Sequence, residues 1–375
     1  MKVSKKVIGN LEKCYSVAPL TYKGKKHMLV AAEKVNQCRL YDLEGNQEEV
    51  IWEGPGGTMS MVQVPGSDGQ FLATHKFYSP NDSKEAKLVT VTPADGVWEV
   101  KTLAELPFVH RFDILVRNGV KYLIACTLKS GHAYKDDWSC PGKVYCAVLP
   151  DDLSTFDEAH PLPLTVLKEG LTKNHGYART EDGGMDTAVI SCENGIFQFL
   201  PPEQKNGEWE IRELLDVPAS DAVLLDLDGD GVVEIPVQEP FPGYAADASE
   251  QVRLTRWLSV SGEQLTEKER GYFSLNDGCV FLLPLSWYDT VTAVNDTLTG
   301  DIVFCRYDGE INDHMTELLR YSVAQDTESQ EERETEGYRL LHTRGKASYY
   351  MKPAETDDSL AQPWQELMVR FSFVQ

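Results

Sequence analysis

The chain has 375 residues and carries 59 acidic against 36 basic side chains, which gives a formal net charge of −23. This charge repels phosphate backbones and anionic lipid surfaces, so it argues against nucleic acid as a partner. The length is sufficient for one large β architecture with an appendage, or for two or three average domains.

The cysteine pattern and the absence of long apolar runs indicate the cellular compartment of the protein. Eight cysteines are scattered without any CxxC pair, and several lie in apolar runs such as YLIACTL, which is typical of free thiols in a reducing environment. No apolar stretch follows the basic start MKVSKKVIGNLEK, and no later run approaches the ~18 apolar residues of a membrane span. We therefore expect a cytoplasmic protein with no membrane span.

A unit of four strand-like segments recurs along the first two thirds of the chain. Each unit has a segment that ends in a turn, an apolar run, and two further runs, the last with alternating polarity. A fifth unit begins at 219–241, and units of about 43 to 65 residues are typical of propeller blades. The apolar runs lie at 28–34, 70–76, 122–129 and 186–193.

These repeats predict an all-β fold, a β-propeller of four-stranded blades over residues 1–250 with about five recognisable blades. A β-sandwich with irregular hairpins is the alternative. The repeat fades beyond residue 250. Residues 251–375 are expected to form an irregular β region that closes the propeller or, as we favour, a small α+β domain, with the acidic stretch 326–337 as a solvated loop.

An acidic loop in the fifth unit has the spacing of a calcium site. Asp226, Asp228, Asp230 and Glu234 stand at positions 1, 3, 5 and 9 of DLDGDGVVE, where alternate carboxylates and the carbonyl of Val232 can surround a hard cation. The alternative is an acidic turn whose Asp and Gly residues serve turn geometry alone. We predict one structural Ca²⁺ at this loop.

Three polar residues share one position in successive units. His110, His175 and Asp221 each stand eleven positions before the start of the second strand of their unit. The first strand of a propeller blade lines the central axis, so these side chains should converge at one mouth, with the calcium loop at the other end. The alternative is that the histidines satisfy backbone carbonyls between blades.

The long loop 128–142 should open at the same mouth, because it joins the second and third strands of its unit. Its acidic, basic and aromatic side chains suit a sugar, whose ring stacks on Trp138 while its hydroxyls take charged hydrogen bonds. A tight acidic turn is the alternative interpretation of KDDW. The predicted catalytic residues are His110, His132, Asp136 and His175, and the predicted substrate-binding residues are Lys135, Asp137, Trp138 and Asp221.

The segments FVHRFDIL, KDDWSCPGKVY, KNHGYA, ENGIFQFLPP and ASDAVLLDLDGDGVVEI resemble FG-GAP/VCBS-repeat, integrin-like β-propellers, and over roughly residues 14–243 those of the bacterial aldos-2-ulose dehydratase type. The resemblance implies a calcium loop between the first two strands of a blade and elimination of water from keto-sugars such as 1,5-anhydrofructose. The family's later blades and cupin-like half are not evident in residues 251–375, which leaves catalysis open.

Two functions of different class therefore remain. As an enzyme, the protein would be a carbon–oxygen lyase, a sugar dehydratase, in which His110 or His175 takes the proton next to a carbonyl and Asp136 or His132 assists departure of the hydroxyl. A second divalent metal at the histidine face would stabilise the enolate. The alternative is a non-catalytic, calcium-stabilised propeller that binds a glycan or a protein partner. Substrate identity and oligomeric state are left open.

Overall fold

The computed structural model describes residues 6–217, 222–245 and 252–374, and the chain divides into two compact units, 1–219 and 220–375. Strands account for 51% of the chain and helices for 5%, so the fold is all-β, as predicted. The repeats in the sequence predict a division near residue 250 instead. The segment of the expected fifth unit thus belongs to the second compact unit.

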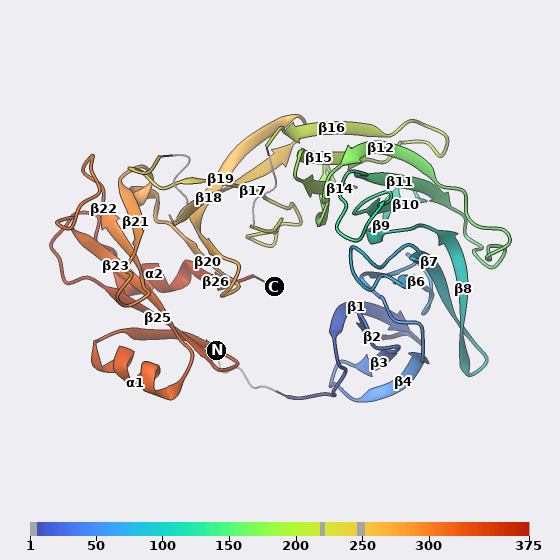
Figure 1. The fold of residues 1–375 in the computed structure, drawn as a ribbon, viewed down its shortest axis with the longest axis horizontal. Helices are drawn as coiled ribbons and strands as arrows, with labels where there is room; N and C mark the ends of the chain where they lie inside the picture. The colour runs from blue at the N-terminus through green and yellow to red at the C-terminus, as the bar shows by residue number, and fades with distance from the viewer. Residues whose placement is uncertain (1–5, 218–221, 246–251, 375) are drawn as a thin grey trace. The chain divides into compact units, whose positions relative to one another are not determined.

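The first unit contains four antiparallel sheets, each made of four strands that follow one another in the chain and in the sheet (Figure 1). In these four units every recurring segment of the sequence forms its expected strand, and the fold is of the β-propeller type, with blades in place of two stacked sheets. The blades are β1 Cys14–Tyr22, β2 Lys25–Ala32, β3 Cys38–Asp42 and β4 Gln47–Trp52; β5 Met61–Gln63, β6 Phe71–His75, β7 Lys87–Ala94 and β8 Val97–Glu105; β9 Val109–Arg117, β10 Val120–Thr127, β11 Gly142–Leu149 and β12 Thr165–Leu171; β13 Gly176–Asp182, β14 Met185–Cys192, β15 Gly195–Leu200 and β16 Glu210–Leu215.

Tight two-residue turns set the register of the first hairpin in three blades. Asn118 and Gly119, with φ of 53° and 76°, join β9 to β10, and Gly183 and Gly184, with φ of 61° and 77°, join β13 to β14. Two successive residues with left-handed backbone conformation form a type I′ turn, and the twist of this turn matches the twist of the two strands that it joins. The equal turn length keeps His110 and His175 at equivalent positions of their blades.

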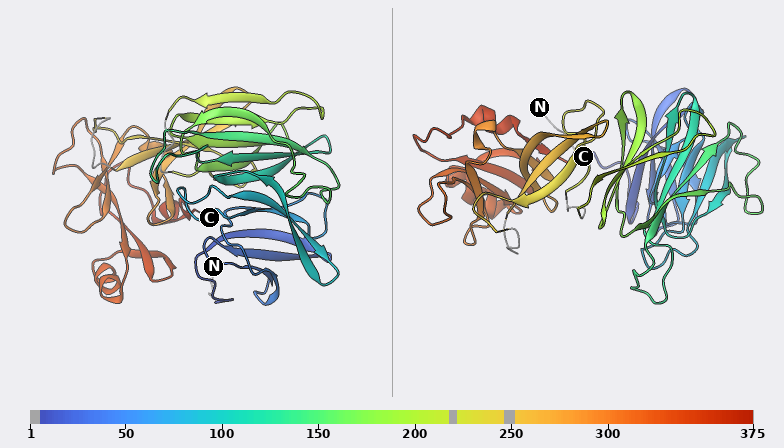
Figure 2. Two further views of the ribbon diagram at one scale, coloured as in Figure 1. Left: turned by 45° about the vertical axis from the view of Figure 1, so that its right-hand side comes forward. Right: turned by 90° about the horizontal axis from the view of Figure 1, so that it is seen from above.

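Apolar side chains fill the spaces between consecutive blades. One cluster joins the first and second blades, a second joins the second and third, and a third joins the third and fourth. The first strands are neighbours in turn, with β1 beside β5, β5 beside β9 and β9 beside β13 and β14 (Figure 2). The first strand is therefore the inner strand of each blade, as the propeller interpretation requires.

The second unit consists of two five-stranded antiparallel sheets around an aromatic cluster that includes Phe281, Trp287 and Phe304. In the described part of the chain, no helix is long and apolar enough to cross a membrane. The first sheet has β17 Ile235–Pro240, β18 Arg253–Ser261, β19 Gln264–Ser274, β20 Cys279–Leu282 and β26 Phe371–Phe373; the second has β21 Val291–Asn295, β22 Ile302–Arg306, β23 Glu317–Ala324, β25 Ala347–Pro353 and β24 Arg339–Arg344; the helices are η1 Leu285–Trp287, α1 Thr327–Thr335 and α2 Trp364–Val369.

Two expectations for this unit differ from the structure. The acidic stretch 326–337 forms the helix α1 instead of a loop, because Asp326 and Ser329 cap its first turn reciprocally; the helix buries none of its residues. Among the described residues before the acidic loop, 222–225, a single bridge from Leu225 to Glu234 stands in place of the first strand of a fifth blade. β17 begins directly after the loop.

Candidate functional site

One end of the first unit gathers the segments that lead into the inner strands and the loops that follow the second strands. Backbone hydrogen bonds join them: Leu128 N–H donates to the Phe108 carbonyl at 3.1 Å, and Glu193 N–H donates to the Thr172 carbonyl at 3.0 Å. The equivalent bonds run from Glu33 N–H to the Lys13 carbonyl in the first blade, at 2.9 Å, and from Lys76 N–H to the Gly56 carbonyl in the second blade, at 2.8 Å. We call this end of the first unit the mouth.

His110 and His175 meet at the mouth. Their ring centroids are 5.4 Å apart with the planes at 79°, an edge-to-face contact between neighbouring blades. His110 lies in β9 with only 6% of its surface exposed and packs on Phe77, whereas His175 immediately precedes β13 and is exposed. The shared register therefore brings these two residues together, one buried and one open to solvent.

Both imidazoles are held in the neutral form. Burial, together with the positive charge of Arg111, lowers the pKa of His110 to about 3. Burial and Arg111 also lower the pKa of His175. A neutral imidazole can accept a proton, so His175 is an accessible base at neutral pH.

Arg111, which the sequence analysis did not single out, brings a positive charge to this pair. Its Nη1 donates to the Met59 carbonyl at 3.0 Å, and its Nη2 lies 3.4 Å from the hydroxyl of Tyr15, on the inner strand of the first blade. Among the described residues no carboxylate forms an ion pair with Arg111. The half-buried guanidinium can thus bind an oxygen of a ligand.

Asn174 and His75 carry buried polar atoms without partners in the described structure. Asn174 is 1% exposed, and neither its amide oxygen nor its amide nitrogen has a hydrogen-bond partner. His75 is 2% exposed, packs edge-on against Trp52 at 4.7 Å, and leaves Nε2 without a partner. Buried polar groups are rarely left unsatisfied, so such atoms indicate places where water or a ligand binds. Asn174 is the chain neighbour of His175.

A polar seam continues from the histidine pair along the inner strands of the third and fourth blades. Asp186 accepts hydrogen bonds from Arg179, at 3.0 Å from Nε, and from the backbone N–H of Val116, at 2.9 Å. Burial raises the pKa of Asp113, which lies near Tyr177 and Arg179. These contacts link β9, which contains His110, to the hairpin of β13 and β14, which directly follows His175.

The long loop is anchored by a lysine that is fully buried. Lys129 Nζ donates to the side chain of Asn81 at 2.8 Å and to the Asp137 carbonyl at 3.1 Å, and it lies 4.4 Å from the ring centroid of Trp138. Lys173 approaches the same ring at 5.7 Å. Trp138 is therefore held between two lysines and packs partly on the core between the second and third blades.

The other predicted loop residues have mixed surroundings. Asp137 accepts bonds from the N–H groups of Ala133 and Ser139 at 2.8 Å, and these bonds lower the pKa of Asp137 to about 2. Asp136 accepts from Asn81 at 2.7 Å, and His132 Nδ1 lies 2.9 Å from the Tyr134 carbonyl. Lys135 is exposed. Within the described residues, no hydrogen bond or ring contact joins His132 or Asp136 to the histidine pair, and Asp221 lies outside those residues.

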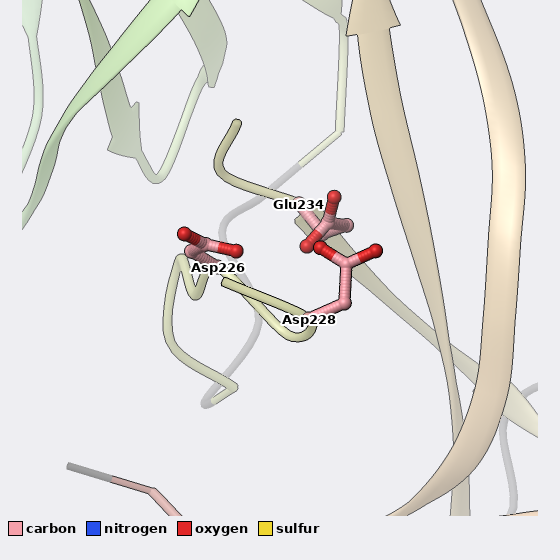
Figure 3. A group of neighbouring side chains, drawn as sticks. All are labelled: Asp226, Asp228 and Glu234. Carbon is pink, nitrogen blue, oxygen red and sulfur yellow. The ribbon is translucent and has the colours of Figure 1, made fainter. Parts of the chain in front are cut away.

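The acidic loop of the second unit brings three predicted metal ligands together. Ligand atoms of Asp226, Asp228 and Glu234 lie within 4.8 Å of one another (Figure 3). Carboxylates of this kind suit Ca²⁺, but an ammonium already lies among them, because Lys268 Nζ is 2.9 Å from both Asp228 and Asp230 and 2.8 Å from Glu234. The carboxylate oxygens are the kind of ligand that calcium prefers, but calcium would have to displace the ammonium group of Lys268.

The histidine face lacks a comparable ligand set. In the described ranges, no group of three His, Cys, Asp or Glu side chains that includes His110 or His175 brings its ligand atoms this close. The second divalent metal therefore stays a prediction without a third protein ligand.

Comparison with known proteins gives no assignment from sequence. No family model matches the chain, and no curated protein matches it. Among solved structures, a luciferin-regenerating enzyme aligns over 92% of this chain and 93% of its own at 9% identity with a TM-score of 0.39. The dihydro-heme d1 dehydrogenase NirN aligns over 81% and 66% at 13% identity with a TM-score of 0.36. Kuenenia stuttgartiensis hydrazine synthase aligns over 48% of this chain and 51% of its own at 12% identity with a TM-score of 0.32, so this chain spans about half of it.

Proposed function

We propose that the first unit is a carbohydrate-directed propeller that acts at its mouth as a carbon–oxygen lyase on a carbonyl-bearing sugar. One observation supports the proposal. The accessible imidazole of His175 lies beside the buried imidazole of His110, and the positive charge of Arg111 lowers the pKa of both rings. This combination supplies a neutral base and a cation, which are the two groups that enolate formation requires.

The steps follow from these groups. Arg111 binds the carbonyl oxygen and stabilises the negative charge that develops there. His175 takes the proton from the carbon next to the carbonyl, and the carbon–oxygen bond to the adjacent hydroxyl breaks as the new double bond forms. The imidazolium of His175 returns its proton to the departing hydroxide, so that water leaves and the base is neutral again.

His110 acts through His175 in this scheme. Its ring is buried against Phe77 and meets His175 edge-on, which limits the orientations open to the exposed imidazole. We therefore regard His110 as a positioning residue and Asn174, with its unpartnered amide, as the neighbour that binds water or a sugar hydroxyl.

Binding of a glycan without chemistry is the second candidate, because two aromatic side chains are open to solvent on this unit. Tyr134 of the long loop is 68% exposed and Tyr15 beside Arg111 is 45% exposed. Exposed aromatic rings stack on the apolar faces of sugars.

Proton exchange in deuterated water separates the two functions. The wild type is incubated with 1,5-anhydrofructose and a panel of ketoses, and NMR follows both deuterium uptake next to the carbonyl and formation of the unsaturated product. We expect both in the wild type, loss of both in His175→Gln, and wild-type behaviour in His160→Gln, whose side chain is 78% exposed. Sugar binding without exchange in the wild type supports the binding function, and equal exchange in His175→Gln refutes its role as the base.

A further inference from the structure

The second unit contains a lysine that reaches the centre of the acidic loop from another strand. Lys268 lies in β19, which is separated from β17 by β18 in the sheet. Its Nζ approaches one carboxylate oxygen each from Asp228, Asp230 and Glu234, at 2.9, 2.9 and 2.8 Å. An ammonium has three N–H donors, so all of them are used by the loop.

A β-bulge positions this lysine. Trp257 pairs with Glu269 and Leu258 pairs with Glu267, which leaves Lys268 as the extra residue opposite the two. Leu258 in turn pairs with Ile235, the residue that follows Glu234. Bulges redirect a side chain from the regular alternation of a strand, and this one lies level with the end of the acidic loop.

The remaining carboxylate oxygens of the loop are also used within the protein. Asp226 accepts from the N–H groups of Gly229, at 2.7 Å, and Gly231, at 3.0 Å. The second oxygen of Glu234, whose side chain is fully buried, accepts from Leu227 N–H at 2.9 Å. The loop is thus closed by hydrogen bonds and one internal cation.

We infer that Lys268 is the resident cation of this loop and takes the structural role that a divalent ion has in loops of the same spacing. Calcium needs the same oxygens at roughly 2.3–2.6 Å, and a second cation at the same place is repelled. The wild-type loop therefore stays ordered without metal. Removing the ammonium leaves the buried carboxylate of Glu234 beside those of Asp228 and Asp230 without a cation, so Lys268→Met should create a calcium site.

The test compares the full-length wild type, Lys268→Met and Lys346→Met, a control that removes an equal charge from an exposed position of the same unit. Calcium binding is measured by isothermal titration, and thermal unfolding is measured in chelator and in excess calcium. We expect no saturable binding and no shift in melting temperature for the wild type and Lys346→Met. For Lys268→Met we expect a lower melting temperature in chelator and recovery in calcium.

Wild-type measurements keep the inference open to refutation if Lys268→Met does not fold. One saturable calcium site in the wild type, with a melting temperature that falls in chelator, overturns it. Lys268→Arg, which retains the charge, should remain indifferent to calcium, and calcium stabilisation of that variant contradicts the inference as well.

Discussion

Two buried histidines of the first unit, His75 and His110, make its stability depend on pH. Burial lowers the pKa of His110 to about 3 and that of His75 to about 4, against an ordinary value of 6.5. Below pH 6.5 the unfolded chain takes up a proton at each residue while the folded chain does not. The free energy of unfolding is therefore unaffected by these two histidines above about pH 6.5, and it decreases as the pH falls from there toward their folded-state pKa values.

The magnitude follows from the linkage relation. Each proton bound only by the unfolded chain costs about 1.4 kcal/mol per pH unit, so between pH 6.5 and pH 5 each histidine removes roughly 2 kcal/mol from the free energy of unfolding. Most carboxylates titrate below this window. The variant His110→Phe keeps an aromatic ring against Phe77 and removes the titrating group.

Urea unfolding at pH 7, 6 and 5 measures this effect on the wild type, His110→Phe and His160→Gln. We expect the loss of stability between pH 7 and pH 5 to be about 2 kcal/mol smaller in His110→Phe than in the wild type, and unchanged in His160→Gln. Equal losses in all three proteins would show that His110 is not held neutral by the fold, and the reasoning about the mouth would fail with it.

Three further predictions concern the mouth and its loop. His175→Ala should abolish ligand binding or turnover while changing the melting temperature little, because the side chain is exposed; a variant that unfolds but retains ligand affinity in its folded fraction would contradict this. Gly142→Ala should destabilise the first unit by about 1–3 kcal/mol in denaturant unfolding, since the added Cβ would lie 1.8 Å from the Thr127 carbonyl oxygen, and a wild-type midpoint would contradict this close approach of Gly142 to Thr127. Asp137→Asn should increase proteolysis within 130–141, because the carboxylate that accepts from Ala133 and Ser139 is replaced by a weaker acceptor; unchanged cleavage rates relative to Lys135→Met would count against that role.

The blades of the first unit could be predicted because the sequence patterns that specify their strands and turns each lie within a short segment of the chain. Recurring apolar runs and runs of alternating polarity identify the strands, and pairs such as Asn118–Gly119 locate the turns, so register alone brings His110 and His175 together. The same logic did not extend to the second unit, where the chain pairs β26 with β20 and places β25 between β23 and β24. β26 and β25 are separated from their partners β20 and β23 by other elements of the chain, and no repeated pattern marks these pairs.

The residues that sequence reasoning missed owe their roles to tertiary contacts. Lys129 looks like any loop lysine until Asn81 and Trp138 enclose it, and Arg111 gains its position from Met59 and Tyr15 on other blades. Lys268 reaches the acidic loop only because of a bulge in β19. The adjacency of Arg111 to His110 in VHRFD was the one local signal available for these three residues.

The central claim is that the mouth around His175 and Arg111 is the working face of the protein. NMR of the histidine ring protons during titration with 1,5-anhydrofructose and a panel of ketoses tests this claim most directly, with each signal assigned by single His→Gln variants. We predict that the signals of His175 and His110 shift together and saturate, that those of His160 and His314 do not move, and that Arg111→Met abolishes the shifts. Saturating shifts that leave His110 and His175 unmoved, or that persist unchanged in Arg111→Met, would contradict the account.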